Sequence, residues 1–286
     1  MGKIVVVGSL HYDIMLSAHH RPEKGETVMG TGCAYKFGGK GGNQAIAAAV
    51  AGAEVCFAGS VGDDQPGQFL LQTLQKHSVY TGYVSVLKGQ PSGMSVAISD
   101  AEGDYGAVVV SNANQHIDLS TFSQEAFWQD VDMLVLQNEV PEAVNLSAAQ
   151  QAKQRGISVS INAAPVRDIS PALQNCIDVL VVNAVEARDM CQVEVKDLRS
   201  ASLAAQTLAQ RFAKVIVTAG EHGVAFCQSG QAVHNLPAVK VKLVSTHGAG
   251  DCFMGVLCTS LINHIPLEHA VEKANEAAAL HVSRVS

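Results

Sequence analysis

Continuous runs of apolar residues, many of them β-branched, recur along the chain. The first covers residues 4–7 and stops at Gly8. Because such a run is apolar on both faces, it predicts a central parallel strand that is covered by helices. Comparable strands are predicted at residues 55–57, 133–136, 157–161, 179–182, 215–217 and 241–244. The pattern therefore predicts a sheet that is mainly parallel and buried on both faces.

Helical patterns lie between these runs. Residues 141–155 open with Pro141 and Glu142 and end at Gly156, which are start and stop signals of a helix. Further helices are predicted at residues 43–51, 200–212, 251–262 and 267–282. The alternation of strands and helices is typical of a doubly wound α/β fold, in which ligands bind at the carboxyl ends of the strands.

Two stretches break this alternation. Residues 27–37 and 92–110 alternate polar and apolar side chains and contain glycine turns, as strands of a sheet with one wet face do. We expect a small β appendage or lid, with segments at about 11–37 and 90–110. No repeat or linker divides the sequence, so we predict a single domain over residues 1–286 that carries this lid.

Composition narrows the class of protein. Of the 286 residues, 48% are hydrophobic and 16% are charged, which indicates a globular protein with a large core. The formal net charge is −7 without a cluster of Lys and Arg, so neither nucleic acid nor a membrane is expected as a partner. The seven cysteines contain no C-x-x-C pair and predict buried, reduced thiols in a cytoplasmic protein. The apolar amino terminus predicts a strand and not a targeting signal.

The first candidate for chemistry is the turn Gly248-Ala249-Gly250-Asp251, which opens a helix. Small residues let a ligand approach the backbone amides, and a helix start offers unpaired N–H groups to phosphate oxygens. Asp251 could accept a proton from an attacking hydroxyl. Helix capping explains the same aspartate without any chemistry, and the turn alone does not separate the two interpretations.

A second glycine-rich segment opens another helix at residues 38–43, with the sequence GGKGGN. It is not a Walker A loop, because its spacing differs and no Ser or Thr follows the lysine. It suits a site where backbone approaches a hydroxyl-rich ligand and where Lys40 and Asn43 supply hydrogen bonds. A flexible surface turn is the alternative, but so many glycines would be costly in conformational entropy for that alone.

Polar residues also follow other predicted strands. Asp13 follows the first strand, where a carboxylate would accept sugar hydroxyls, and His11 beside it is equally open to a structural or a ligand-binding role. Asn183 and Glu186 could hold a hydrated Mg²⁺, although a helix-capping box is the simpler explanation of the same two residues. For residues 218–223, which join two strands, an ordinary turn is the default interpretation.

Taken together and in order, these motifs resemble the ribokinase or PfkB family of carbohydrate kinases over essentially the whole chain. The carriers are GSLHYD at 8–13, GGKGGN at 38–43, QNE at 137–139, NAAP at 162–165, Asn183 with Glu186, TAGEHG at 218–223 and GAGD at 248–251. Each motif alone is modest, whereas the ordered set is highly specific. The resemblance implies a ribokinase-like three-layer α/β/α sandwich with a mainly parallel sheet and a small β-sheet lid, which is often used for dimerisation.

The resemblance also implies a role for each matching residue. The sugar would be bound by His11, Asp13, Gly39, Lys40, Asn43 and Glu139, next to the catalytic base Asp251. The nucleotide would be bound by Asn183, Thr218, Gly220, Gly223, Gly250 and Asn275, and Glu186 would organise Mg²⁺ through water. The amides of Gly248, Ala249, Gly250 and Asp251 would form the anion hole.

The sequence departs from the family pattern at three places. His11 stands where ribokinases proper carry an Asn that contacts ribose, which puts ribose itself in question. Ser245 stands where many members have an Asp that helps to hold a monovalent cation, which puts potassium activation in question. The sequence also stops at Ser286, short of the carboxy-terminal loop and helix that are usual in the family.

We therefore expect an enzyme that phosphorylates a hydroxyl on ribose or a similar unphosphorylated sugar or polyol. ATP and Mg²⁺ would be its cofactors, and Asp251 would deprotonate the attacking hydroxyl. Two alternatives stay open, namely a nucleoside kinase of the same family and a non-catalytic relic that binds a sugar or a nucleotide. A homodimer joined through the lid is the expected assembly.

Overall fold

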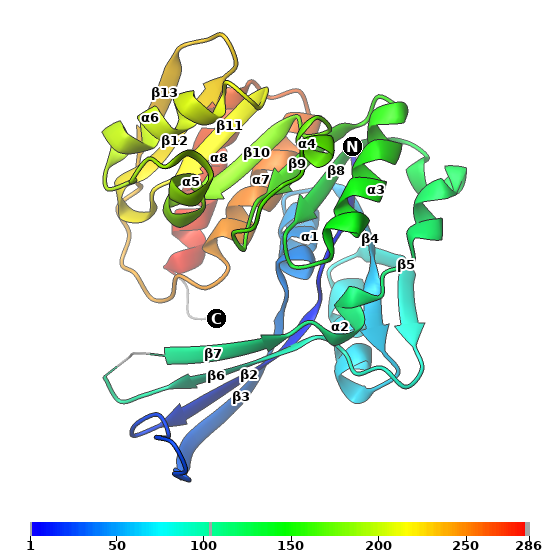
Figure 1. Cartoon of the computed structure of the whole chain (residues 1–286), viewed down its shortest axis with the longest axis vertical. Coiled ribbons are helices and arrows are strands. Elements are labelled where there is room, and N and C mark those ends of the chain that lie inside the picture. The colour runs from blue at the N-terminus through cyan, green and yellow to red at the C-terminus, as the bar shows by residue number, and fades with distance from the viewer. Residues whose placement is uncertain (1, 103–104, 284–286) are drawn as a thin grey trace.

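The computed structural model describes residues 2–102 and 105–283, and within these ranges the strands form one nine-stranded and one four-stranded sheet (Figure 1). This arrangement confirms the predicted α/β class with a large, mostly parallel sheet and a smaller separate one. The large sheet contains, in pairing order, β13 (Val233–Pro237), β12 (Gly223–Gln228), β11 (Lys214–Thr218), β10 (Val179–Asn183), β9 (Ser158–Asn162), β8 (Val131–Gln137), β1 (Lys3–Val7), β4 (Glu54–Gly62) and β5 (Val79–Leu87).

Within the large sheet β12 is antiparallel to its two neighbours, and the other pairs run parallel. β1 lies between β4 and β8. The chain runs from β1 to β4 and β5 on one side and then returns to β8 on the other. β1 and β8 therefore form the topological switch point, where open α/β sheets bind their ligands beyond the carboxyl ends of the strands.

Helices cover both faces of the large sheet (Figure 1). One face carries α1 (Lys40–Val50), α2 (Gln65–Lys76), α7 (Ala249–Ile262) and α8 (Leu267–Val282). The other carries α3 (Glu142–Gln154), α4 (Pro171–Gln174), α5 (Ala184–Cys191) and α6 (Leu198–Leu208). In β1, Ile4 and Val6 pack with the first set and Val5 and Val7 with the second, and all four are fully buried. The apolar run at residues 4–7 thus has the two-faced burial that its sequence predicts.

α1 and α7 pack closely because α7 carries a glycine at the contact. A Cβ on Gly255 would lie 2.5 Å from the Cβ of Ala47 in α1. The first residues of the two helices, Lys40 and Ala249, line the same pocket. The close packing of the helices therefore brings their amino-terminal ends together.

The small sheet projects from the end of β1 (Figure 1). It contains, in pairing order, β3 (Gly30–Gly38), β2 (His11–Ala18), β6 (Met94–Ser99) and β7 (Tyr105–Val110). β2 is antiparallel to β3 and parallel to β6. Large apolar side chains such as Tyr35 and Val108 remain exposed on this sheet. Only residues 8–10 separate β1 from β2, so the small sheet joins the main domain at the switch point.

Two expectations from the sequence are wrong. Residues 241–244 form no strand but belong to an irregular loop, in which the side chain of Leu243 is 62% exposed. Alternating Val and Lys resemble an edge strand in sequence, but β13 already occupies that edge of the sheet. No disulfide joins the seven cysteines, all of which lie in the described ranges, but Cys33 on β3 is exposed and Cys191 and Cys252 are only partly buried, which corrects the prediction of buried thiols. Within the described ranges no helix is long and apolar enough to cross a membrane.

Candidate active site

Two motifs of the amino-terminal half meet where β1 ends. A Cβ on Gly41 would lie 2.6 Å from the backbone N of Ser9, and a Cβ on Gly39 would lie 2.7 Å from the backbone O of Ser9. Gly39 also has a φ of 90°, which residues with a side chain rarely adopt. The two glycines therefore allow the start of α1 to contact the protein's own backbone, and this packing explains them without a ligand.

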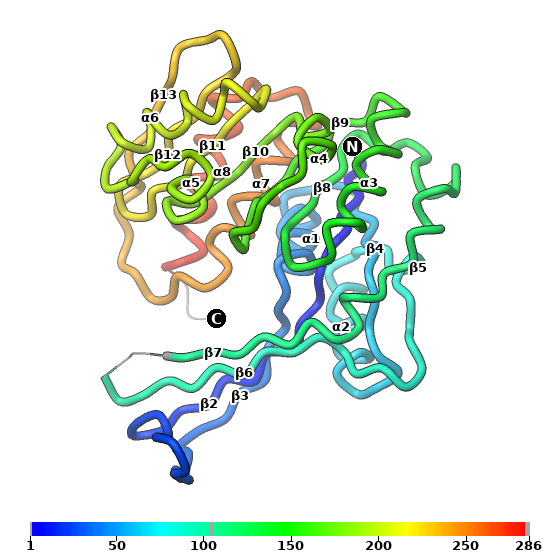
Figure 2. Tube along the Cα trace, viewed as in Figure 1, coloured from blue at the N-terminus to red at the C-terminus, as the bar shows by residue number. Residues whose placement is uncertain are grey.

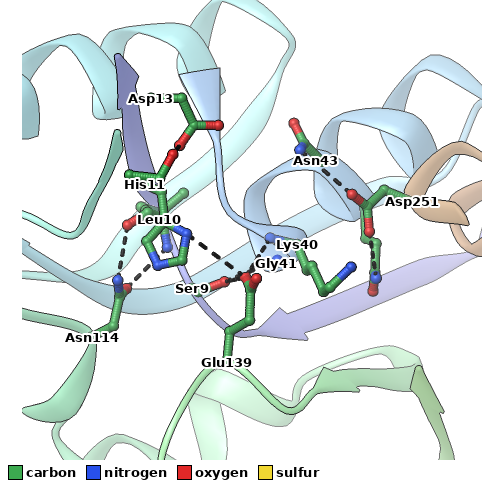
Figure 3. Close-up of polar contacts among 12 residues, drawn as sticks. Ser9, Leu10, His11, Asp13, Lys40, Gly41, Asn43, Asn114, Glu139 and Asp251 are labelled. Carbon is green, nitrogen blue, oxygen red and sulfur yellow. Dashed lines mark hydrogen bonds and ion pairs between the residues drawn. The ribbon is translucent and has the colours of Figure 1, made fainter. Parts of the chain in front are cut away.

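Glu139, which follows β8, is held at this junction (Figure 3). Its Oε2 accepts hydrogen bonds from the backbone N of Lys40, at 2.8 Å, and from the hydroxyl of Ser9. The Nδ1 of His11 lies 3.9 Å from the same oxygen. His11 is buried, and among the described residues its Nε2 has no hydrogen-bond partner. Two segments that are distant in sequence, residues 9–11 and the start of α1, thus converge on the carboxylate of a third.

Asp13 lies on β2, near the base of the small sheet. Its carboxylate accepts a hydrogen bond from the hydroxyl of Ser95 on the neighbouring strand β6. Burial raises the pKa of Asp13, and the hydrogen bond from Ser95 partly opposes this rise. A buried carboxylate of this kind is stabilised by further hydrogen-bond donors, which the hydroxyl groups of a substrate can supply.

Asn114 fixes the backbone just before β2. Its Nδ2 donates to the backbone O of Leu10 and its Oδ1 accepts from the backbone N of Leu10, both at 2.9 Å. The side-chain amide of Asn114 thereby makes the two backbone hydrogen bonds with Leu10 that a neighbouring strand would otherwise make. Because His11 follows Leu10 directly, Asn114 also determines where the side chain of His11 begins (Figure 3).

Asp251 lies in the first turn of α7 and is buried. Its Oδ1 accepts a hydrogen bond from Nε2 of Gln44 at 2.9 Å, and its Oδ2 lies 3.5 Å from Nδ2 of Asn43. Burial raises the pKa of Asp251, while the charge of Lys40 and the hydrogen bond from Gln44 lower it. A carboxylate with a raised pKa that still faces donors is well suited to accept a proton.

A pocket of about 350 Å³ opens beside Asp251. It is lined by Lys40, Asn183, Ala184, Val185, Thr218, Gly220, Thr246, Gly248, Ala249, Gly250 and Asp251. The structure therefore places the predicted base, the predicted anion hole and four of the six predicted nucleotide residues around one space, with Gly250 belonging to both of the last two sets. Lys40 belongs to both halves of the site, because its backbone N binds Glu139 while the residue also lines this pocket.

Three helices begin at this pocket, and two of them, α5 and α7, differ in how their first turns are capped. α5 has a complete capping box, in which Asn183 Oδ1 accepts from the backbone N of Glu186 and Glu186 accepts from the backbone N of Asn183. The cap of α7 is Gly248, which has a φ of 73° and offers no side chain. The backbone N of Ala249 donates to the backbone O of Thr246 at 3.3 Å, whereas no side chain of the described residues caps the amides of Gly250 and Asp251, which stay available for phosphate oxygens.

Three of the residues predicted for the nucleotide or its Mg²⁺ do not line this pocket. Gly223 begins β12 with a φ of 117°, and Nδ2 of Asn275 donates to the backbone O of Pro237 at 3.0 Å. Glu186 is buried, and both of its oxygens accept hydrogen bonds from Asn183, so the capping interpretation of this pair is confirmed. Burial raises the pKa of Glu186.

No side chains among the described residues form a ready-made metal cluster of three or more His, Cys, Asp or Glu. The residues that the sequence did not single out are Gln44, Ser95 and Asn114. Gln44 follows Lys40 by one helical turn, which is the signal that places both on one side of α1. Ser95 and Asn114 carry no such signal, because their partners lie far away in the sequence.

Comparison with known proteins gives a consistent result. Residues 1–286 match the family described as pfkB family carbohydrate kinase. The ribokinase of Bacillus subtilis is 34% identical over 99% of this chain and 93% of its own length. The deoxyribokinase of Salmonella typhi is 30% identical over 98% and 92%. The crystal structure of a ribokinase from Cryptococcus neoformans var. grubii in complex with ADP aligns with a TM-score of 0.87 and 27% identity, over 100% of this chain and 94% of that one.

Proposed function

The chain belongs to the pfkB family of carbohydrate kinases and is an ATP-dependent sugar kinase, and we propose that it phosphorylates ribose or a similar small unphosphorylated sugar or polyol with Asp251 as general base. One observation carries the assignment of the base. Asp251 is bonded by Gln44 from the glycine-rich start of α1 and also lines the pocket with Asn183 and Thr218. It therefore lies between the residues proposed for the sugar and those proposed for the nucleotide.

On the sugar side, the proposed ligands are His11, Asp13, Gly39, Lys40, Asn43 and Glu139. Asp13 and Glu139 present oxygens that accept hydrogen bonds from sugar hydroxyls. Asn43 and the Nε2 of His11 would meet other polar atoms of the sugar. Their arrangement supports a neutral, hydroxyl-rich substrate, because two carboxylates close together would repel one that is already phosphorylated.

On the nucleotide side, Asn183, Thr218 and Gly220 line the pocket and are proposed to contact ATP. Gly223 and Asn275, which lie outside that lining, are kept as outer contacts of the nucleotide. Mg²⁺ would arrive on the ATP phosphates and neutralise their charge, with Glu186 reached only through water. Such an outer position suits Glu186, because its two oxygens are already bonded to Asn183.

In the proposed reaction Asp251 takes the proton of the attacking hydroxyl as that oxygen approaches the γ-phosphorus of ATP. The amides of residues 248–251 and the ammonium group of Lys40 would stabilise the charge that develops on the phosphoryl oxygens. Gln44 and Asn43 hold the Asp251 carboxylate in place. Positioning and charge neutralisation supply most of the rate enhancement in this class of reaction.

The test is a coupled assay of ADP release over pentoses, hexoses, polyols and nucleosides, with and without potassium. We expect a pentose or a close relative to give the highest kcat/KM. Preference for a nucleoside would replace the proposed substrate class, and ADP release no faster than background hydrolysis with every compound would contradict the kinase itself. Comparison of assays with and without potassium tests whether Ser245 permits activation by that cation.

The small sheet is proposed to act as a lid and to join two copies of the chain in a cytoplasmic homodimer. Tyr35 on β3 and Val108 on β7 are 60% and 67% exposed, and such apolar surface favours burial against a partner. Light scattering coupled to size exclusion would give twice the monomer mass if this proposal is right. A monomer at micromolar concentration would contradict it.

A further inference from the structure

The loop at residues 238–248 leads from β13 into the uncapped start of α7. It has no helix or strand, and its apolar side chains Leu243 and Val244 are 62% and 47% exposed. Apolar packing therefore contributes little to its position. The placement of Gly248, from which the proposed anion hole begins, must depend largely on hydrogen bonds to the loop.

The end of α8 lies beside this loop (Figure 2), and three such bonds reach the loop from its last turn. The backbone O of Val282 accepts from the backbone N of Val244, at 2.8 Å, and from that of Ser245, at 3.2 Å. The ring Nε2 of His281 lies 2.9 Å from the backbone O of His247. Since a carbonyl oxygen can only accept, the ring must carry its proton on Nε2 and donate.

The ring of His281 also touches the next residue of the loop. A Cβ on Gly248 would lie 3.2 Å from Nε2 of His281. The helix that carries this ring is firmly placed, because Ala270, Val271 and Ala274 of α8 are fully buried in the core. One exposed side chain thus connects a rigid helix to the two residues that precede Ala249.

We propose that His281 is a positioning residue for phosphoryl transfer, which holds the His247–Gly248 backbone so that the first amides of α7 face the transferred group. The inference rests on the proposed role of residues 248–251. It predicts an effect on kcat and not on sugar affinity, because His281 bonds to the phosphate side of the site and not to Asp13 or Glu139. A hydrogen-bond donor at this position, and not the imidazole itself, is what the geometry requires.

The test compares His281→Ala, His281→Phe and His281→Gln. Loss of one such bond is expected to lower kcat about tenfold in the Ala and Phe variants, with the KM for the sugar unchanged. Gln keeps a donor at similar reach, so it should restore kcat to within about twofold of the parent protein. Because His281 is exposed, these variants are expected to fold.

A second measurement separates this inference from the proposed function. Hydrogen exchange at the amides of residues 246–250 in the ligand-free protein should quicken about tenfold in the Ala and Phe variants and stay slow in the Gln variant. The matched control is His77→Ala, because Nδ1 of His77 also lies 2.9 Å from a backbone carbonyl, that of Thr73 in α2. It should change neither measurement.

Three results would overturn the inference: full kcat with parental exchange in the Ala variant, no rescue by Gln, or the same loss in His77→Ala. If no substrate is ever turned over, the exchange measurement still decides whether His281 orders the loop. Failure of the kinase assignment and failure of the positioning role are therefore distinguishable.

Discussion

The two sides of the candidate site are built in different ways. On the sugar side, carboxylates are fixed by protein donors, since Glu139 is bonded by Ser9 and the Lys40 amide and Asp13 is bonded by Ser95. On the phosphate side, α7 begins at a glycine without a side-chain cap, at the end of an irregular loop. A neutral polyol needs preset acceptors, whereas a phosphate group needs backbone amides that no protein group has already taken.

The largest expected effect lies where the two sides meet. Asp251→Asn removes the proposed base and keeps the shape of the side chain, so kcat should fall about 10³- to 10⁴-fold. The KM for the sugar and the affinity for ADP should stay within about threefold, because the rest of each side is intact. Steady-state kinetics and calorimetric ADP titration measure these quantities. A variant that keeps a tenth of the activity would show that another group takes the proton.

The next effect should be confined to the sugar side. Asp13→Asn removes the charge of an acceptor that Ser95 already fixes, and the KM for the sugar should rise about 100-fold, as loss of charged hydrogen bonds implies. The KM for ATP should not change. Asp118→Asn is the control, because Asp118 is an exposed aspartate whose side chain, within the described part of the chain, bonds only to nearby Ser120. Equal changes in both KM values for Asp13→Asn would mean that the two sides are not separate.

Lys40 belongs to both sides, and its charge lowers the pKa of Asp251. Lys40→Met should therefore raise the pKa of Asp251 and shift the acidic limb of the kcat/KM profile to higher pH. The reason is that a general base works only when it is deprotonated, so activity is lost as pH falls through its pKa. The check is a pH–rate profile of both proteins in a constant-ionic-strength buffer. An unchanged limb would assign the base to a group that Lys40 does not influence.

The smallest effect concerns stability. Burial raises the folded-state pKa of Asp251, so the charged form is disfavoured in the folded protein. This penalty is present above the folded pKa and disappears below the unfolded value of about 3.9. Asp251→Asn should thus raise Tm by about 2 °C at neutral pH, and the gain should shrink as pH falls. Scanning calorimetry across pH measures it.

The control for this prediction has the opposite sign. Hydrogen bonds from the side chain and backbone of Ser120 lower the pKa of Asp118, so its charge is favoured in the folded protein. Asp118→Asn should therefore lower Tm slightly at neutral pH. A lower Tm for Asp251→Asn as well would show that the Asp251 carboxylate is not strained by burial.

The sequence predicted correctly those helices and strands whose apolar residues follow a simple, regular pattern. The two-faced apolar runs of β1 and β10 and the helix at residues 142–154, which starts after Pro141 and stops before Gly156, follow from local rules. The false strand at residues 241–244 shows the limit of those rules, because alternating Val and Lys suit an edge strand only if an edge is free. Which strand forms the edge of a sheet is decided by the tertiary structure, and β13 is the edge strand here.

The same limit applies to the candidate site. Asp13, Glu139 and Asp251 could be selected because ordered motifs carry them, and the structure brings their segments to one end of the sheet. The residues that hold their segments in place could not be selected from the sequence. Ser95, Asn114 and His281 belong to no motif, and their importance depends on contacts between distant parts of the fold. From the sequence, Lys40 was assigned to the sugar alone. In the structure its backbone N bonds to Glu139 while the residue also lines the pocket beside Asp251, and a motif does not show that one residue has two contacts.

The contact at Gly255 has a consequence for how the active site can change. Its missing Cβ sets the distance between α1 and α7, and each helix carries one part of the reaction at its first turn. A single methyl group added at position 255 would push the two helices apart and separate Gln44 from Asp251, without altering any residue that meets a substrate. Libraries made to alter specificity should therefore keep Gly255 unchanged. When a variant still binds its ligands but has lost turnover, position 255 is the first remote site to check for a mutation.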